Sequence, residues 1–198
     1  MGSEMCIRDS ATTSDQVTDS MSAMGVGIDD LQGYLDVIVT TNNKANTTAA
    51  DLMDAFIGCG GAARAAGMNY KETSTALGIL ANNGIKGSEA GTALNSMLVR
   101  ISTKDVAQKA FKDLGVAVYD SSGEMRNMRD ILVDLNGAMA GMTQEQKNSY
   151  MSAIAGTNYY SQFGYLLDGV KEGVNGSASA WDELAGACLL YTSDAADD

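Results

Sequence analysis

The side chains best suited to catalysis in this 198-residue chain are neighbouring carboxylates, because two of them can act as general acid and general base. Three such pairs occur: Asp29 with Asp30, Asp51 with Asp54, and Asp182 with Glu183. The first two fall at expected helix starts, where the helix dipole favours negative charge. Capping and solvation therefore explain them better than acid–base chemistry does. The third pair follows Trp181 and has no evident partner in the sequence.

A further acidic group, from Asp120 to Glu124, has a composition compatible with calcium binding. It lacks the alternating ligand register and the twelfth-position glutamate of an EF-hand. Its Asp-Ser-Ser-Gly sequence is typical of a turn, and a turn is what we predict.

Two arginines follow that turn, Arg126 and Arg129, and together they could bind an anion. Pairing with nearby surface carboxylates is the better interpretation, since such pairs are common and weak. The candidate partners are Glu124, Asp130 and Asp134.

Residues 58–67 are dense in glycine and alanine and suggest a phosphate-binding loop at first sight. The glycine spacing fits neither the dinucleotide nor the P-loop pattern, and no Lys-Ser or Lys-Thr pair follows. We predict instead a helix whose small face allows a neighbouring helix to approach closely. It contains Cys59, a thiol with no second cysteine nearby.

Composition excludes several functional classes. Histidine is absent, which removes Ser-His, Cys-His and histidine–metal chemistry from this chain. The net charge of −12 argues against nucleic-acid binding, which depends on neutralising phosphates. The sequence contains no run of 18 apolar residues, the length that a membrane-spanning helix needs. We expect no enzymatic activity, no catalytic, cofactor-binding or metal-binding residues, and no cofactor.

Apolar residues recur at helical spacing through most of the chain, and proline is absent. Three stripes are expected to bury one helix face each: Leu31, Leu35 and Ile38; Leu94, Met97, Leu98 and Ile101; and Met128, Ile131, Leu132, Leu135 and Met139. The many methionines could form an adaptable partner surface, but core packing is the preferred role for Met97, Met125, Met128 and Met139.

The predicted fold is all-α, a compact multi-helix bundle of about eight to nine short helices with one short extended segment near 116–119. The predicted helices are 14–23, 29–44, 48–66, 70–82, 88–101, 103–114, 126–140, 143–155 and 158–169, with a weaker one over 177–185. Capping pairs mark four starts: Thr48 with Asp51, Asn69 with Glu72, Ser102 with Asp105, and Thr143 with Gln146. Glycines mark the stops, at Gly67, Gly84, Gly115, Gly141 and Gly156.

The two ends differ in origin from the rest. Residues 1–10 and 188–198 resemble the in-frame translations of the two arms of a sequencing-library adapter, so we expect neither to be native. The remaining chain, 11–187, would then be an internal piece of a longer reading frame, and Cys59 its single cysteine.

The most distinctive pattern is a helix–turn–helix segment around residue 84. Gly84 can adopt positive φ and end a helix, and Ile85 can fold back onto that helix. Gly87 precedes Ser88, the expected N-cap of the next helix. Gly91 is expected to keep that helix thin where the two cross, and Leu94, Met97 and Leu98 to form its buried stripe. These residues predict a tight helical elbow, a structural motif without reactive groups.

The segment from Ala76 to Arg100 is similar to the core of tailed-phage tape measure proteins of the lactococcal-phage type. The resemblance continues through residues 110–116, 120–123, 125–127 and 131–132, and covers about 11–169. At Asn95 the family commonly has arginine, which puts a charge contact there in doubt. The resemblance divides the chain into a first part of the helical tape-measure core, 11–115, and a second helical part, 116–187.

Membership of that family would imply a structural component of the virion that sets tail length and assists tail assembly and DNA ejection. It would also imply the tail tube protein and tail assembly chaperones as partners, together with self-association. The location would be the lumen of the virion tail, and the host cytoplasm during assembly. The alternative is a cellular helical protein–protein interaction module without enzymatic activity.

Overall fold

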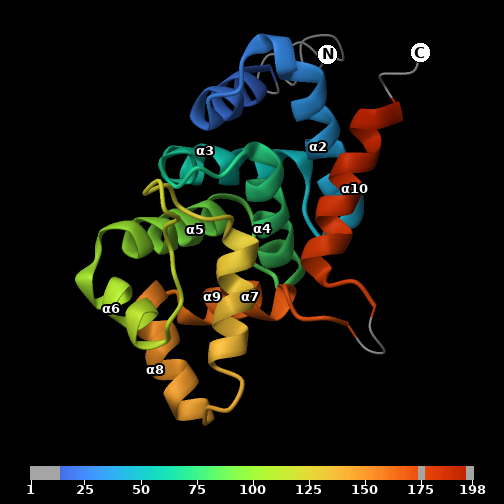
Figure 1. Cartoon of the computed structure of the whole chain (residues 1–198). Helices are drawn as coiled ribbons and strands as arrows, with labels where there is room; N and C mark the ends of the chain where they lie inside the picture. Colours follow the sequence, from blue (N-terminus) through green and yellow to red (C-terminus); the bar gives the residue numbers. More distant parts are fainter. Residues whose placement is uncertain (1–13, 174–176, 195–198) are drawn as a thin grey trace.

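The computed structural model describes residues 14–173 and 177–194, with side chains described up to residue 187. The regular structure of this part is helical (Figure 1). After a helix over residues 14–24 come η1 (Ile28–Asp30), α2 (Leu31–Lys44), α3 (Ala49–Ala65), α4 (Tyr70–Asn82), α5 (Gly87–Thr103), α6 (Asp105–Asp113), α7 (Met128–Ala138), α8 (Gln144–Ala155), α9 (Tyr160–Gly169) and α10 (Ala180–Asp194).

The all-α prediction is confirmed, but the predicted number of eight to nine helices is too low for the described residues. The main difference is α10, which periodicity indicated only weakly. It packs on α2 and α4 through Trp181, 3% exposed, and Leu184, 5% exposed. Tertiary packing therefore stabilises a helix that local sequence favours little.

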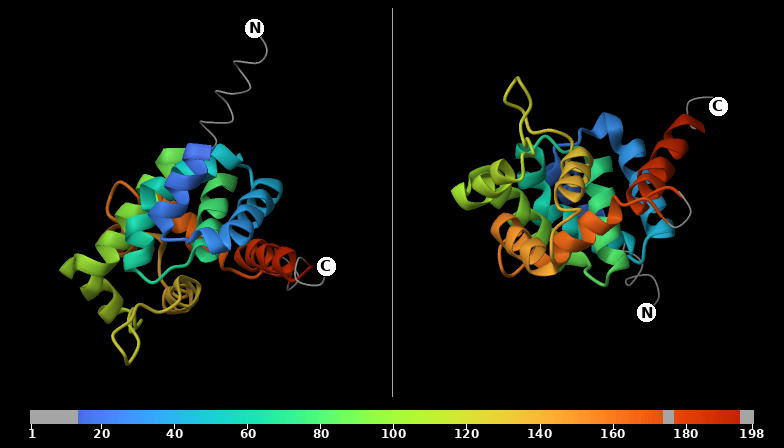
Figure 2. Two further views of the ribbon diagram at one scale, coloured as in Figure 1. Left: turned by 90° about the horizontal axis from the view of Figure 1, so that it is seen from above. Right: turned by 60° about the horizontal axis from the view of Figure 1, so that its bottom comes forward.

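The predicted extended segment near 116–119 is wrong, because an isolated bridge between Tyr119 and Met125 replaces a strand. Two backbone hydrogen bonds close this hairpin-like loop, and the Asp120 carboxylate accepts the Ser122 N–H at 2.8 Å. The predicted turn is confirmed. With so few paired residues the loop stays irregular, and it projects from the helices in Figure 2.

Three of the four predicted helix starts are confirmed by side-chain caps. The Thr48 hydroxyl accepts the Asp51 N–H, Asn69 accepts the Glu72 N–H, and Thr143 forms a full capping box with Gln146. The Ser102 prediction is wrong: its hydroxyl donates to the Leu98 carbonyl at 2.9 Å, and α6 begins after Lys104 without a side-chain cap. A serine inside a helix can bond back to the preceding turn, and here it does.

Glycines with positive φ end several helices, as predicted. Gly67, Gly84 and Gly115 have φ between 71° and 87°, and the residue after each glycine donates its N–H to a carbonyl five residues earlier. This is the Schellman arrangement, which pairs carbonyls left over at a helix end. Gly156 has φ 89° with an extended ψ of 157°. The prediction for Gly141 is wrong, since α7 ends at Ala138 and Gly141 has no positive φ.

Close approach between helices depends on glycines of the small-residue segment. A Cβ on Gly60 would lie 2.7 Å from the backbone of Ala23, in the helix over 14–24. On the α5 side, a Cβ on Gly91 would lie 2.4 Å from the Ala55 carbonyl oxygen of α3. The predicted close approach is confirmed. One expectation was wrong: Gly91 allows α5 to approach α3 closely, whereas the sequence analysis placed this close approach between α5 and α4.

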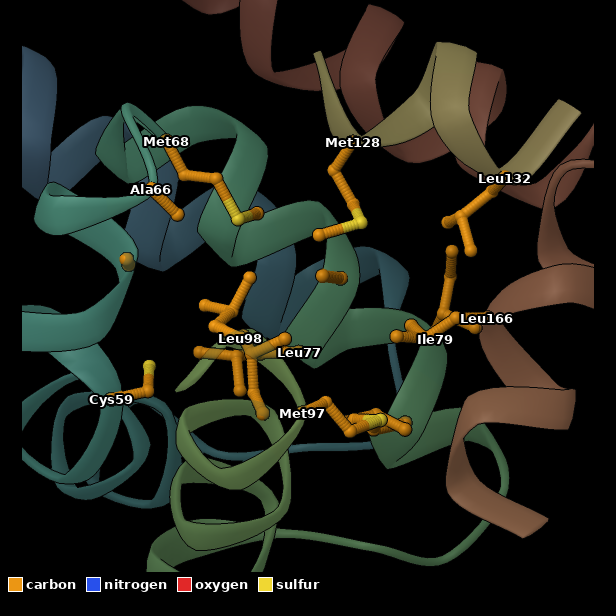
Figure 3. Close-up of a cluster of buried hydrophobic side chains, with 14 of the residues drawn as sticks. Cys59, Ala66, Met68, Leu77, Ile79, Met97, Leu98, Met128, Leu132 and Leu166 are labelled. Carbon is orange, nitrogen blue, oxygen red and sulfur yellow. The ribbon is translucent and has the colours of Figure 1, made fainter. Parts of the chain in front are cut away.

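One hydrophobic cluster connects the helices, and Figure 3 shows part of it. The stripes of α5 and α7 are buried as predicted, and Met97, Met128 and Met139 lie in the core. The α2 stripe is only partly buried as a whole: Ile38 is 3% exposed, whereas Leu31 and Leu35 are of intermediate burial.

Candidate functional site

The segment singled out by the sequence forms the connection between α4 and α5. Gly84 has φ 87°, and the Ile85 N–H donates to the Leu80 carbonyl at 3.0 Å. The turn also contacts the connection between α2 and α3, because Lys86 Nζ donates to Asn46 Oδ1 at 2.9 Å. The chain reverses here within four residues, from Asn83 to Lys86.

The start of α5 differs from the expectation for Ser88. The helix begins at Gly87, which has φ 56°, with Lys86 at the N-cap and no side-chain cap. Ser88 is an exposed residue of the first turn. Because Gly87 completes the turn with positive φ, the helix begins two residues earlier than it would with Ser88 as the N-cap.

The remaining motif residues face inward. Leu94, Met97 and Leu98 are at most 1% exposed, and Gly91 is buried against α3. The structure thus brings the predicted residues together as a turn and an adjoining core. Their chemistry is apolar contact and backbone geometry, which can position helices.

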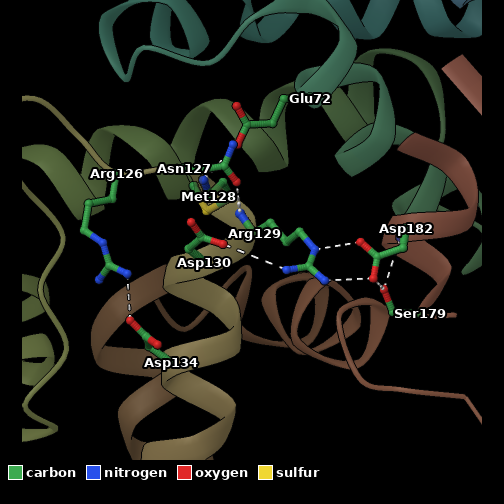
Figure 4. A network of polar contacts seen from close by, with 9 residues as sticks. All are labelled: Glu72, Arg126, Asn127, Met128, Arg129, Asp130, Asp134, Ser179 and Asp182. Carbon is green, nitrogen blue, oxygen red and sulfur yellow. Dashed lines mark hydrogen bonds and ion pairs between the residues drawn. The ribbon is translucent and has the colours of Figure 1, made fainter. Parts of the chain in front are cut away.

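A polar network joins α7 to α10 (Figure 4). Arg129 donates Nε to Asp182 Oδ1 at 2.7 Å and one terminal nitrogen to Asp182 Oδ2 at 2.8 Å, and the Ser179 hydroxyl donates to the same carboxylate. These hydrogen bonds raise the pKa of Arg129 and lower the pKa of Asp182. The pair spans 53 residues, so the sequence offered no local signal for it.

The predicted partners of the two arginines are confirmed in part. Arg126 pairs with Asp134 at 2.9 Å, and Arg129 lies 3.9 Å from Asp130. Glu124 forms neither pair among the described ion pairs.

At three helix ends, a side chain from a neighbouring helix forms a hydrogen bond with a free backbone N–H or C=O group. Glu72 of α4 accepts the N–H of Met128, the first residue of α7, at 2.8 Å. Burial raises the pKa of Glu72. Arg100 of α5 donates to the Ala153 carbonyl at the end of α8, and Asn136 of α7 donates to the Leu167 carbonyl near the end of α9. Such contacts pair groups that a helix end leaves free.

In each carboxylate pair from the sequence analysis, at least one member accepts a hydrogen bond from another side chain. Asp30 accepts the Tyr70 hydroxyl at 2.8 Å, Asp51 accepts the Thr48 hydroxyl, and Asp54 accepts the Gln16 amide. Among the described residues there is no group of three histidine, cysteine, aspartate or glutamate side chains that could hold a metal ion. Burial raises the pKa of the Cys59 thiol to about 12, which disfavours the reactive thiolate.

The described helices include none that is long and apolar enough to cross a membrane. The family model of phage-related minor tail proteins matches residues 6–156, which is most of the chain. The chain belongs to this family. The matched range includes the turn between α4 and α5, the α3–α5 crossing and the loop at 117–126.

Two curated relatives of this minor tail protein are similar in sequence. The tape measure protein of Pneumococcus phage Dp-1 is 32% identical over 180 residues, which is 90% of this chain and 16% of that protein. The probable tape measure protein of Escherichia phage P2 is 29% identical over 155 residues, 77% of this chain and 19% of that protein. The chain therefore spans less than a fifth of either relative. No solved structure matches it.

Proposed function

We propose that this chain is a non-enzymatic structural domain of a phage tail tape measure protein, which takes part in setting tail length, in tail assembly and in DNA ejection. The observation that carries the proposal is the family match, which extends over a set of helices packed around one hydrophobic core. The similarity to two tape measure proteins supports the same role.

In this proposal the domain lies in the lumen of the virion tail, and in the host cytoplasm while tails assemble. Its partners are the tail tube protein, tail assembly chaperones and further copies of the same polypeptide. The role requires a stable fold, and the α4–α5 turn and the buried α3–α5 crossing contribute to it.

The domain acts as a compact module within the longer protein rather than as a part of an extended ruler. About 180 residues in one straight helix would span about 270 Å, at 1.5 Å per residue. A compact domain of the same length has a radius of gyration of about 16 Å, which corresponds to a diameter of about 40 Å. The helix-ending glycines and the shared core favour the compact form.

The experiment uses phage Dp-1, whose tape measure protein contains a matched segment of 180 residues. One phage has this segment deleted, and a second has it replaced by residues 14–187 of this chain. We expect the deletion to abolish tailed particles and the replacement to restore them in electron micrographs. The control is the replacement with Leu94→Asp, which places a charge in the core and should not restore tails. Normal tails from the deletion phage would refute the proposal.

The compact form has its own test, a tandem duplication of the same segment. A compact module should lengthen the tail by no more than about 40 Å. An increase near 270 Å, the length of an extended helix, would refute it.

A further inference from the structure

An apolar groove lies between the helix over 14–24 and the start of α2, at the edge of the molecule that Figure 1 shows at the top. We call it the N-terminal groove. It has a volume of about 680 Å³. Its apolar lining consists of Val17, Met21, Val26, Ile28, Leu31 and Leu35.

The groove contains apolar surface that the fold leaves uncovered. Ile28 is 74% exposed, the highest value among the exposed large hydrophobic residues described. Leu31 and Leu35 also line the groove and are only partly buried, whereas Ile38 further along α2 is 3% exposed. A contiguous apolar surface of this kind, bordered by polar residues, marks an interaction site.

The helices that form the groove are acidic in sequence, although Arg64 of α3 lies against Gly25 in the connection between them. Residues 14–43 contain no lysine or arginine, and Lys44 is the first basic residue of the described chain. The same stretch carries five aspartates: Asp15, Asp19, Asp29, Asp30 and Asp36. Acidic helices on either side of an apolar groove favour a partner with the complementary pattern, an apolar stripe flanked by positive charge.

We propose that the N-terminal groove binds a basic amphipathic helix of another protein. Apolar side chains at helical spacing would contact Ile28, Leu31 and Leu35, and lysine or arginine side chains on both flanks would face the aspartates. A second copy of this chain fits poorly, because it would bring the same five aspartates against one another. This inference does not depend on the proposed role in tail length.

The test measures binding of a fluorescent amphipathic peptide of about 18 residues, five helical turns, with leucines on one face and lysines elsewhere. A peptide of the same composition with the leucines scattered serves as the first control. The second is a matched pair of variants, Ile28→Asp in the groove and Val106→Asp on α6, where Val106 is 61% exposed. Circular dichroism checks that both variants fold.

Both variants add one negative charge, so general attraction to a basic peptide would strengthen binding to each. If the groove is the site, Ile28→Asp weakens binding at least about tenfold through lost apolar contact, and Val106→Asp changes it less than about twofold. The amphipathic peptide should also bind at least about tenfold more tightly than the scattered one.

Three results would overturn the proposal. The first is equal affinity for the two peptides, and the second is unchanged affinity in Ile28→Asp. The third is a wild-type dimer in sedimentation experiments that Ile28→Asp converts to a monomer, since this would assign the groove to a second copy of the chain.

Discussion

Replacing Gly91 by alanine tests the α3–α5 crossing with one methyl group. The added Cβ would lie 2.4 Å from the Ala55 carbonyl oxygen and 3.0 Å from the Ala55 Cα. Both atoms belong to the backbone of α3, so no side-chain rotation can relieve the contact. The two helices must move apart, which loosens the packing around Leu94 and Leu98 as well.

The magnitude follows from two opposing effects. Overpacking of this kind costs about 1–3 kcal/mol, and contact with backbone places Gly91→Ala near the upper value. Alanine recovers about 1 kcal/mol of helix propensity relative to glycine. The net loss is about 2 kcal/mol. In a domain of this size about 1 kcal/mol corresponds to about 2–4 °C, so the midpoint of thermal unfolding should fall by about 4–8 °C.

The assay is urea and thermal unfolding of the whole chain, followed by circular dichroism, beside the control Gly61→Ala. Gly61 lies in the same helix as Ala55, and a Cβ there meets nothing within 4 Å. The control should gain up to about 1 kcal/mol from propensity alone. A Gly91→Ala variant as stable as the wild type, or more stable, would show that α3 and α5 do not depend on a glycine at their crossing.

Three further outcomes are expected. Asp182→Asn breaks the bidentate pair with Arg129, and since both side chains are about two-fifths exposed the loss should be about 0.5–1 kcal/mol in urea unfolding, smaller in 1 M salt. Burial raises the pKa of Glu72 above its usual 4.5, so the folded chain holds this proton more tightly and the wild type loses stability as pH rises through the raised pKa. The unfolding free energy of Glu72→Gln should therefore rise relative to that of the wild type between pH 4 and pH 7. Parallel pH profiles of the two proteins would contradict this. In a variant with Cys6 and Cys188 changed to serine, a disulfide reagent at pH 8 should label Cys59 only after unfolding, because the thiol is buried with a pKa of about 12; rapid labelling of the folded chain would argue against this burial.

Local signals predicted the ends of several helices well. A threonine or asparagine followed three residues later by a carboxylate or amide is enough to specify a cap, as at Thr48 and Asn69. Glycine at position 84 similarly specifies a helix end, because few other residues adopt its φ of 87°. The errors at Ser88 and Ser102 have one cause: serine can also bond within a helix or remain exposed, so its presence alone does not fix a start.

Contacts between residues far apart in the chain could not be predicted from the sequence. Arg129 and Asp182 lie 53 residues apart and meet because α4 packs against α10 and also contacts the start of α7 through Glu72. Periodicity showed that α2 has an apolar stripe, but it could not show that Ile38 would be fully buried and Leu35 only partly buried. The number of helices was underestimated for the same reason, since α10 is stabilised by burial of Trp181 against other helices.

The three helix ends that neighbouring helices satisfy have a common direction along the chain. Glu72 precedes Met128 by 56 residues, Arg100 precedes the end of α8, and Asn136 precedes the end of α9. In each case the ribosome makes the capping side chain before the helix that it completes. The growing polypeptide can therefore stabilise α7, α8 and α9 in turn as they emerge, before the rest of the fold has been synthesised.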